Sequence, residues 1–528
     1  MTRRTRPFRA TASALVMLVL SLVLVGAGAG PATAADSWIP ISGTGSTWSQ
    51  NALDQWRKNV AANYGMTVNY SGVGSSAGRR DFIGGTVDFA VSEIPFQSVP
   101  EDGSPPEVPN TGFAYMPIVA GGTSFMYNLK IGGKRVTNLR LSGATISKIF
   151  TGEIANWNDA AVQADNPGLA MPDRPIVPVV RSDGSGSSAQ FTLWMSKQHG
   201  DIWTHGMTSQ FPPPANAKAQ NGSLGVAGYV SQDYGEGSIT YVEYSYAVKS
   251  GFPVAKVLNA AGYYVEPTAP SVAVALMRAD INRDSSSPDY LTQILDGVYS
   301  SPDARAYALS SYSYMIVPTE VAGIFTTDKG RTLGAFANYM LCEGQQQAQA
   351  LGYSPLPMNL VIAGSEQIKR IPGANVAGVD INACNNPTFK PGDSPDNNQL
   401  AATAPQPAEC DRIGPDQCTT GTGGAPEVTP VSGSGNGGAA ADAGATAAGA
   451  GATTGGAAAA AVYDSDGNLI SGSSAVAGSA VSSPFTLGDP GWGMAQWLMC
   501  AAGALLLLGI AVPPLVSRRL RDGAPRAD

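Results

Sequence analysis

The chain has few residues that could perform acid–base or metal chemistry. Its 528 residues include only two histidines, His199 and His205, which would have to supply any imidazole base. Both flank "GDIWT" in a loop-like stretch, which favours a solvated or helix-capping role. The five cysteines show none of the spacings of a zinc site. A metalloenzyme and a histidine-dependent hydrolase are therefore poor interpretations of this sequence.

Basic residues are also in the minority. The chain has 32 Lys and Arg against 40 Asp and Glu, which gives a formal net charge of -8 and a pI near 5.0. A protein that binds nucleic acid needs a basic face to displace counterions from the phosphates. The composition argues against that class, and any anion that this chain binds must be held by local geometry.

Long apolar runs are confined to the two ends. Residues 14–25 follow an arginine-rich start and precede Ala-Thr-Ala-Ala, which predicts a secretory signal peptide over residues 1–35, cleaved near Ala34 or Ala35. An uncleaved membrane anchor is the alternative, and the lack of a nearby cysteine excludes a lipidated N-terminus. Residues 492–516 are uncharged and precede an arginine-rich tail, which predicts one transmembrane helix with residues 517–528 in the cytoplasm. A buried core helix is the alternative there.

Between these runs, the C-terminal part has a composition that does not favour folding. Residues 391–490 are rich in Pro, Asp and Asn and then in Gly, Ala and Thr, which predicts a disordered tether, with a local hairpin conceivable at 462–472. Export permits disulfides, and four cysteines could form two bridges in three ways. The pairs closest in sequence are Cys342 with Cys384 and Cys410 with Cys418.

Residues 38–372 alternate between strand-like and helix-like patterns. A helix is predicted over residues 51–65, because Leu53, Trp56 and Val60 share one face before a glycine. The alternation predicts an α/β architecture, and the length predicts two lobes. The strand-like runs are residues 66–74, 87–95, 124–129, 175–180, 238–248 and 311–318.

Three Gly/Ser-rich turns share one design: a strand-like run ends in Gly, Ser or Thr, and a helix-like run begins. They are "SGTGSTWSQNALDQW" (42–56), "YSGVGSSAGRRDFIGG" (70–85) and "RSDGSGSSAQFTLWM" (181–195). Such turns present backbone N–H groups, hydroxyls and the positive end of a helix dipole. One such turn is equally well explained as a helix cap. Three together, one of them with an arginine, predict an anion-binding site.

In the third turn, Arg181 could grip an oxyanion while Asp183 holds its guanidinium in place. A helix is expected from about Ser187, with residues 184–186 as its amide-rich start. The alternative is an exposed ion pair of little energetic value. Ser185 does not lie in a Gly-x-Ser-x-Gly elbow, and none of the turns ends in the Gly-Lys-Ser/Thr of a nucleotide-binding loop.

Over residues 41–372 a series of motifs carries a family resemblance. In order, they are "GTGSTW", "VNYSGVGSSAG", "TVDFAVSEIP", "GEIANWNDAAV", "RSDGSGSSAQFT", "ITYVEYSYA", "LSSYSYMIV" and "LGYSPLP". In them the chain resembles the phosphate-binding protein, the receptor of the high-affinity phosphate ABC transporter. The resemblance implies a two-lobed periplasmic-binding-protein (Venus-flytrap) fold, type II-like, that closes over phosphate without catalysis or a cofactor. It also implies a first lobe of residues 36–128 plus 250–380 and a second lobe of residues 129–249.

The resemblance further implies a set of phosphate-binding groups. They are Thr47, the backbone N–H of Trp48, Ser75, Glu93, Arg181, Ser185, the backbone of Gly186, and Ser187, with Asp183 orienting the arginine. Glu93 stands where the family has an aspartate that accepts a hydrogen bond from protonated phosphate, and such a carboxylate repels sulfate. The extra methylene could alter affinity or ligand choice. Ser187 replaces a commoner threonine.

We therefore expect a membrane-anchored extracellular receptor that binds inorganic phosphate and delivers it to an ABC permease. The same fold could instead bind another oxyanion or act as a phosphate sensor. From a different class, a phosphoester hydrolase would use Ser185 or Ser75 as its nucleophile. A surface adhesin with vestigial lobes is a further alternative.

Overall fold

The computed structural model describes residues 38–433, apart from 101–102, 288 and 375–376, together with two short strands beyond them. The chain divides into two units, residues 1–448 and residues 449–528. In the second unit, β16 (Val462–Tyr463) and β17 (Leu469–Ser471) pair antiparallel, as the hairpin interpretation requires. The predicted signal peptide, membrane helix and basic tail lie outside the described residues. None of the helices in the described part of the chain combines the length and the apolar character that crossing a bilayer requires.

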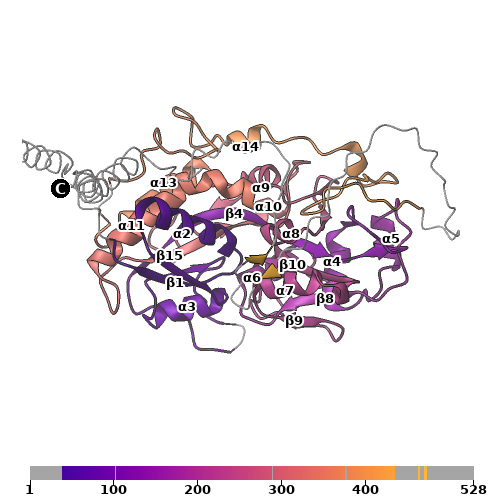
Figure 1. The fold of residues 1–528 in the computed structure, drawn as a ribbon, viewed down its shortest axis with the longest axis horizontal. Coiled ribbons are helices and arrows are strands. Elements are labelled where there is room, and N and C mark those ends of the chain that lie inside the picture. The colour runs from indigo at the N-terminus through magenta and orange to yellow at the C-terminus, as the bar shows by residue number, and fades with distance from the viewer. Residues whose placement is uncertain are drawn as a thin grey trace, which may run out of the picture. The chain divides into compact units, whose positions relative to one another are not determined.

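One mixed sheet of eleven strands runs through the first unit (Figure 1). Its main path is β2-β1-β3-β15-β4-β10-β8-β9, and β7, β11 and β12 extend it beside β4. The strands are β1 (Ile41–Gly45), β2 (Val68–Gly72), β3 (Phe89–Ser92), β4 (Phe113–Tyr127), β7 (Arg140–Leu141), β8 (Val177–Arg181), β9 (Lys218–Gln220), β10 (Ser238–Glu243), β11 (Val254–Leu258), β12 (Tyr264–Val265) and β15 (Ser310–Pro318). Separate short pairs are β5 (Lys130–Ile131) with β6 (Lys134–Arg135) and β13 (Asp280–Ile281) with β14 (Gln293–Ile294).

The long strand β4 joins two lobes. Its first part pairs antiparallel with β15 as far as Gly122, and its last part, from Thr123 onward, pairs with β10. The parallel strands β1, β2 and β3 complete the first lobe, and the parallel strands β8, β9 and β10 complete the second. The β4–β15 register shifts at Ser313 and Tyr314, and such a β-bulge changes the direction of nearby side chains.

Helices cover each lobe. Those of the first lobe are α2 (Gln50–Tyr64), α3 (Ser75–Ile83), α9 (Ala269–Leu276), α11 (Thr327–Leu341), η2 (Glu343–Gln347), α12 (Ala348–Leu351) and α13 (Met358–Ile368), while the short α10 (Asp296–Tyr299) contacts α6 of the second lobe. Those of the second are α4 (Gly143–Thr151), α5 (Ala160–Asp165), α6 (Gly186–Gln198), α7 (Gly222–Val230), η1 (Asp233–Gly235) and α8 (Tyr244–Ser250). The predicted first helix is confirmed as α2: its predicted face is buried, and it ends at Gly65 with φ 67°.

The strand predicted over residues 238–248 is only half right. Its alternating apolar and polar residues continue to Val248, yet the chain turns from β10 into α8 at Tyr244. The Glu243 side chain accepts a hydrogen bond from the backbone N–H of Ser245 at 2.8 Å, and Gly251 ends the helix in the left-handed conformation. Because both ends of this segment are capped, it forms a helix although its alternating pattern is typical of a strand.

The boundary predicted at residue 250 also differs from the structure. Strand β11 pairs with the end of β4 and with β7, and β12 pairs with β11, so both extend the second lobe. The chain returns to the first lobe with α9, which packs against β4 and β15.

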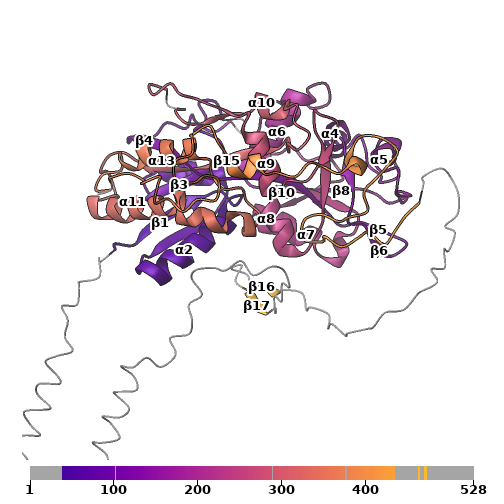
Figure 2. The same cartoon turned by 90° about the horizontal axis from the view of Figure 1, so that it is seen from above.

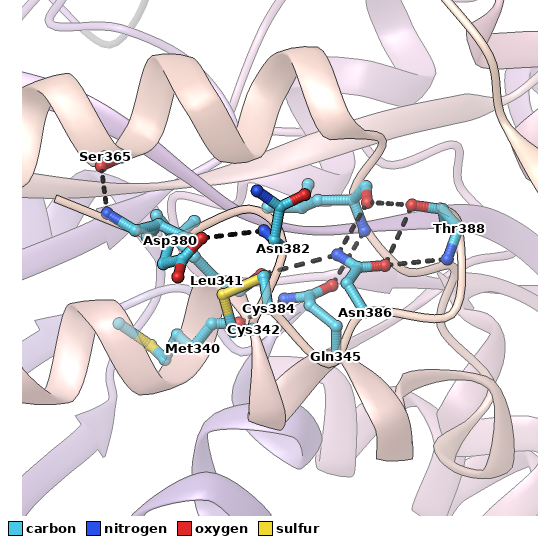
Figure 3. Close-up of a disulfide and its surroundings, with 12 residues drawn as sticks. Met340, Leu341, Cys342, Gln345, Ser365, Asp380, Asn382, Cys384, Asn386 and Thr388 are labelled. Carbon is cyan, nitrogen blue, oxygen red and sulfur yellow. Dashed lines mark hydrogen bonds between the residues drawn. A yellow bond between two sulfur atoms is a disulfide. The ribbon is translucent and has the colours of Figure 1, made fainter. Parts of the chain in front are cut away.

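The tether predicted to start at residue 391 does not begin there. Residues 391–433 pack on both lobes and contain α14 (Gln399–Ala402) and η3 (Glu409–Asp411). Figure 1 shows this orange segment passing from α14 towards α5, and Figure 2 shows orange chain near both α9 and α5. Polar side chains replace the missing large apolar ones: Gln417 and Thr422, for example, hydrogen-bond the backbone of the second lobe. The predicted disulfides Cys342–Cys384 (Figure 3) and Cys410–Cys418 are both confirmed.

Candidate anion-binding site

Four helix N-termini meet between the lobes. Helices α2 and α3 come from the first lobe, and α6 and α7 come from the second. The hydroxyls of Thr47 and Ser223 lie 2.8 Å apart, and the N–H of Gly186 donates to Ser75 Oγ at 3.1 Å. Because the first N–H groups of a helix lack partners within it and carry partial positive charge, this junction favours an anion. The structure thus brings the three Gly/Ser-rich turns together.

Glycines permit this close approach. A Cβ on Gly186 would lie 1.9 Å from Glu93 Oε2, across the junction between the lobes. Gly74 adopts a φ of 93°, and a Cβ there would lie 2.6 Å from Asp183 Oδ2. Any side chain at either position would hold the lobes apart.

Arg181 ends strand β8 and is buried, with 3% of its surface exposed. Its Nε donates to Asp183 Oδ1 at 2.7 Å, its Nη2 donates to Asp183 Oδ2, and its Nη1 donates to Ser223 Oγ at 3.3 Å. These partners leave two of its five N–H groups for an oxyanion. An exposed surface ion pair is therefore the wrong interpretation.

Asp183 is held ionised by its partners. Burial acts to raise the pKa of this carboxyl, but the Arg181 guanidinium and the N–H of Gly222, which donates at 2.9 Å, more than offset it. The pKa of Asp183 is therefore lowered. A charged Asp183 fixes the plane of the guanidinium, which makes Arg181 a rigid donor.

The Glu93 carboxylate faces the same junction and is 1% exposed. Its Oε1 accepts from Ser46 Oγ at 2.5 Å and from Ser313 Oγ at 2.9 Å, and its Oε2 accepts from Ser75 Oγ at 2.8 Å. Burial raises the pKa of Glu93, while the three hydroxyls and Arg181 act in the opposite direction. Three donors on one carboxylate fix its position as an acceptor in the site.

The other predicted groups differ in their availability. Ser187 Oγ is buried and has no hydrogen-bond partner among the described residues, so it can serve a ligand. Ser185 Oγ instead caps α6 by accepting from the N–H of Ser188 at 3.2 Å. The N–H of Trp48 donates to Ser46 Oγ at 2.9 Å. Both groups line the junction, but both have a partner within the chain.

Three serines of the site were missed in the sequence. Ser46 lies inside the first predicted turn, one residue before Thr47. Ser223 lies in "NGSLG", which follows β9 and opens α7, so the same Gly/Ser-turn pattern could have revealed it. Ser313 has no local signal, because only the bulge in β15 and the pairing with β3 bring it to Glu93.

The geometry does not support nucleophilic catalysis. His199 lies at the C-terminal end of α6, about 20 Å along a thirteen-residue helix from Ser185, and packs against Trp194. Burial lowers the pKa of His199. Ser75 Oγ donates a hydrogen bond to the Glu93 carboxylate, not to an imidazole that could act as a base. Within residues 38–433 as described, no cluster of three or more His, Cys, Asp or Glu side chains could hold a metal ion.

Comparison with known proteins places this architecture in a family. Residues 27–343 match the PBP superfamily domain. Phosphate-binding protein PstS of Xylella fastidiosa (strain Temecula1) is 32% identical over 337 residues, which cover 63% of this chain and 85% of the relative. Phosphate-binding protein PstS 2 of Mycobacterium tuberculosis is 30% identical over 322 residues, which cover 60% of this chain and 83% of the relative.

Solved structures are more distant in sequence. The high affinity periplasmic phosphate-binding protein PfluDING, bound with phosphate, has 20% identity and a TM-score of 0.47, and the match covers 61% of this chain and 92% of that one. A human phosphate binding apolipoprotein has 21% identity and a TM-score of 0.48 with the same coverage. The superfamily match and the bacterial relatives show that this chain belongs to the phosphate-binding protein family of the PBP superfamily.

Proposed function

We propose that this chain is an extracellular receptor that binds inorganic phosphate between its two lobes and delivers it to an ABC permease. The observation that carries the proposal is the buried Arg181–Asp183 pair, which faces the Glu93 carboxylate where four helix N-termini meet. The names of the bacterial relatives support the same ligand.

Both lobes contribute donors to the proposed phosphate site. Thr47 and Ser75 come from the first lobe, and Arg181, Ser187 and the N–H of Gly186 come from the second. Phosphate would take the place of the hydrogen bonds that the Gly186 N–H makes to Ser75 and that Ser75 makes to Glu93. Because these groups are buried, their charge-assisted hydrogen bonds to an oxyanion form in a low-dielectric environment, where they are strong. Binding therefore favours closure of the lobes and needs no covalent step.

Glu93 would give the site its selectivity. Phosphate carries a proton near neutral pH and can donate it to the carboxylate, whereas sulfate has none and meets a like charge. The hydroxyls of Ser46, Ser75 and Ser313 donate to the carboxylate and hold it in place.

Equilibrium dialysis of the full chain in detergent with radiolabelled phosphate tests the proposed function. We expect one phosphate to be retained per chain and no turnover of a chromogenic phosphomonoester. Turnover that is lost in Ser185→Ala or Ser75→Ala would instead support a hydrolase. Absence of both binding and turnover would support the adhesin interpretation.

The proposal includes export by the signal peptide at residues 1–35 and anchoring by residues 492–516. Protease added outside intact cells should digest the binding lobes, and a chain that ends at residue 490 should appear in the medium. Retention of that shortened chain on the cells would contradict anchoring by the C-terminal apolar run.

Ser223→Ala is expected to lower the phosphate affinity about 3- to 10-fold, in keeping with the net loss of one or two hydrogen bonds. Ser223 Oγ accepts from Arg181 and lies against Thr47, so its loss would loosen a donor in each lobe. Ser231→Ala is the matched control, because Ser231 ends the same helix and bonds only within it. Calorimetric affinities that are equal for the two variants would show that Ser223 does not position the site.

A further inference from the structure

The chain passes between the lobes a third time after the domain that its relatives share. We call residues 377–433 the strap. It begins on the first lobe, where the Cys342–Cys384 disulfide ties it to the end of α11 (Figure 3). Thr388 Oγ1 then donates to the carbonyl of Leu356 at 2.7 Å. The start of the strap is therefore fixed covalently and by hydrogen bonds.

The strap stays on the first lobe through α14, which packs against α9. The Arg305 guanidinium donates from Nη1 to the carbonyls of Ala401 at 3.1 Å and Ala404 at 3.3 Å. A second guanidinium receives the strap on the other lobe: Arg140 Nη1, on β7, donates to the carbonyls of Cys410 at 3.1 Å and Asp416 at 2.7 Å. The passage between the lobes thus lies between Ala404 and Cys410.

An ion pair helps to hold the strap where it reaches the second lobe. Lys256 Nζ on β11 lies 2.7 Å and 2.6 Å from the two Asp411 carboxylate oxygens, and the side chains are only 12% and 9% exposed. Further along, Gln417 Nε2 donates to the carbonyl of Asn138 at 3.0 Å, and the hydroxyls of Thr137 and Thr429 lie 2.7 Å apart. These contacts hold the later part of the strap, from Cys410 onward, on the second lobe.

The passage itself is short and stiff. It reads "APQPAEC", and its two prolines, Pro405 and Pro407, favour an extended chain of about 3.1 Å per residue. The five residues 404–408, which lie outside the helices and end where η3 begins, span about 15 Å and cannot absorb a displacement as a glycine-rich linker would. Rotation of one lobe against the other must deform this passage or break contacts at one of its ends.

We propose that the strap is a third connection that restrains rotation of the lobes and stabilises the closed arrangement. The strap is bound to both lobes in an arrangement in which the lobes meet at Gly186 and Glu93, so a rotation away from it must deform the stiff passage or break these contacts. A ligand that binds the closed form gains apparent affinity in proportion to the population of that form. The effect on phosphate affinity rests on the proposed function, whereas the restraint on the lobes does not.

Lengthening the passage tests the proposal without removing any contact. Eight Gly/Ser residues are inserted between Gln406 and Pro407 in the full chain with Cys500→Ser. The matched control carries the same insertion between Pro395 and Asp396, where the contacts on both sides belong to the first lobe. Spin labels at Val321→Cys and Tyr234→Cys, which are 56% and 70% exposed on opposite lobes, report the distance between the lobes by electron double resonance.

We expect the Gln406 insertion to broaden the phosphate-free distance distribution towards longer values. It should also raise the phosphate Kd about 3- to 10-fold through faster dissociation, as a lower closed population requires. The control insertion should change neither. A Gln406 insertion that behaves like the control in the distance measurement would overturn the proposal. If the parent chain binds no phosphate, the proposed function fails, while the distances still decide whether the strap restrains the lobes.

Discussion

Arg181→Ala is expected to lower the phosphate affinity by about 2–5 kcal/mol, or roughly 30- to 4000-fold. The substitution removes a buried cation that has two N–H groups available for the ligand, and it leaves the Asp183 carboxylate buried without its main partner. An uncompensated negative charge beside the site repels phosphate, so the loss should exceed that of a single hydrogen bond. Calorimetric titration of each variant with phosphate measures it.

Three further variants separate the causes. Arg174→Ala removes an arginine of the same lobe that pairs with Glu236 at the surface and should leave phosphate affinity unchanged. Arg181→Lys keeps the charge but loses the planar fork, so its affinity should fall between those of the parent and Arg181→Ala. In the double variant Arg181→Ala with Asp183→Asn, no buried carboxylate is left without its partner. Its thermal stability should therefore exceed that of Arg181→Ala, while its phosphate affinity should stay low. Phosphate affinity in Arg181→Ala within threefold of the parent would contradict the role of Arg181.

Glu93→Gln is expected to weaken phosphate binding and to admit sulfate, so that the ratio of the two affinities falls by at least about 100-fold. The amide has nearly the shape of the carboxylate and can keep contacts to the three serine hydroxyls, but it carries no charge against sulfate. Competition titrations with the two anions measure the ratio. A variant that still rejects sulfate would show that selectivity arises elsewhere in the site.

Glu93 should also make the phosphate affinity depend on pH. Burial raises the pKa of Glu93, so this carboxyl takes up a proton at a higher pH than an exposed glutamate as the solution is acidified. Once protonated, it no longer offers the phosphate proton a charged acceptor, and affinity should fall as the pH drops through that raised pKa. Glu93→Gln lacks this step, which makes it the control for the titration of phosphate itself. Parallel pH profiles for parent and variant would contradict the assignment.

The sequence revealed the parts of the site that depend on neighbouring residues. Each Gly/Ser-rich turn is a strand end followed by a helix start, and α2 follows from the spacing of its apolar face. The choice of the cysteine pairs closest in sequence was also correct.

Features that depend on distant contacts were not visible. The position of Ser313 requires a bulge in β15, and the helix at Tyr244 requires a cap from Glu243. The strap escaped prediction for another reason. Its composition offers little apolar surface to bury, but hydrogen bonds from Arg305 and Arg140 to its carbonyls and an ion pair at Asp411 hold it on the lobes instead.

The most direct test of the account is calorimetric titration of the full chain with phosphate, followed by sulfate, near neutral pH. We predict binding of one phosphate per chain, with no heat from sulfate and no displacement of phosphate by it. Absence of phosphate binding, or equal binding of the two anions, would contradict a receptor in which Arg181 grips the anion and Glu93 selects the protonated one.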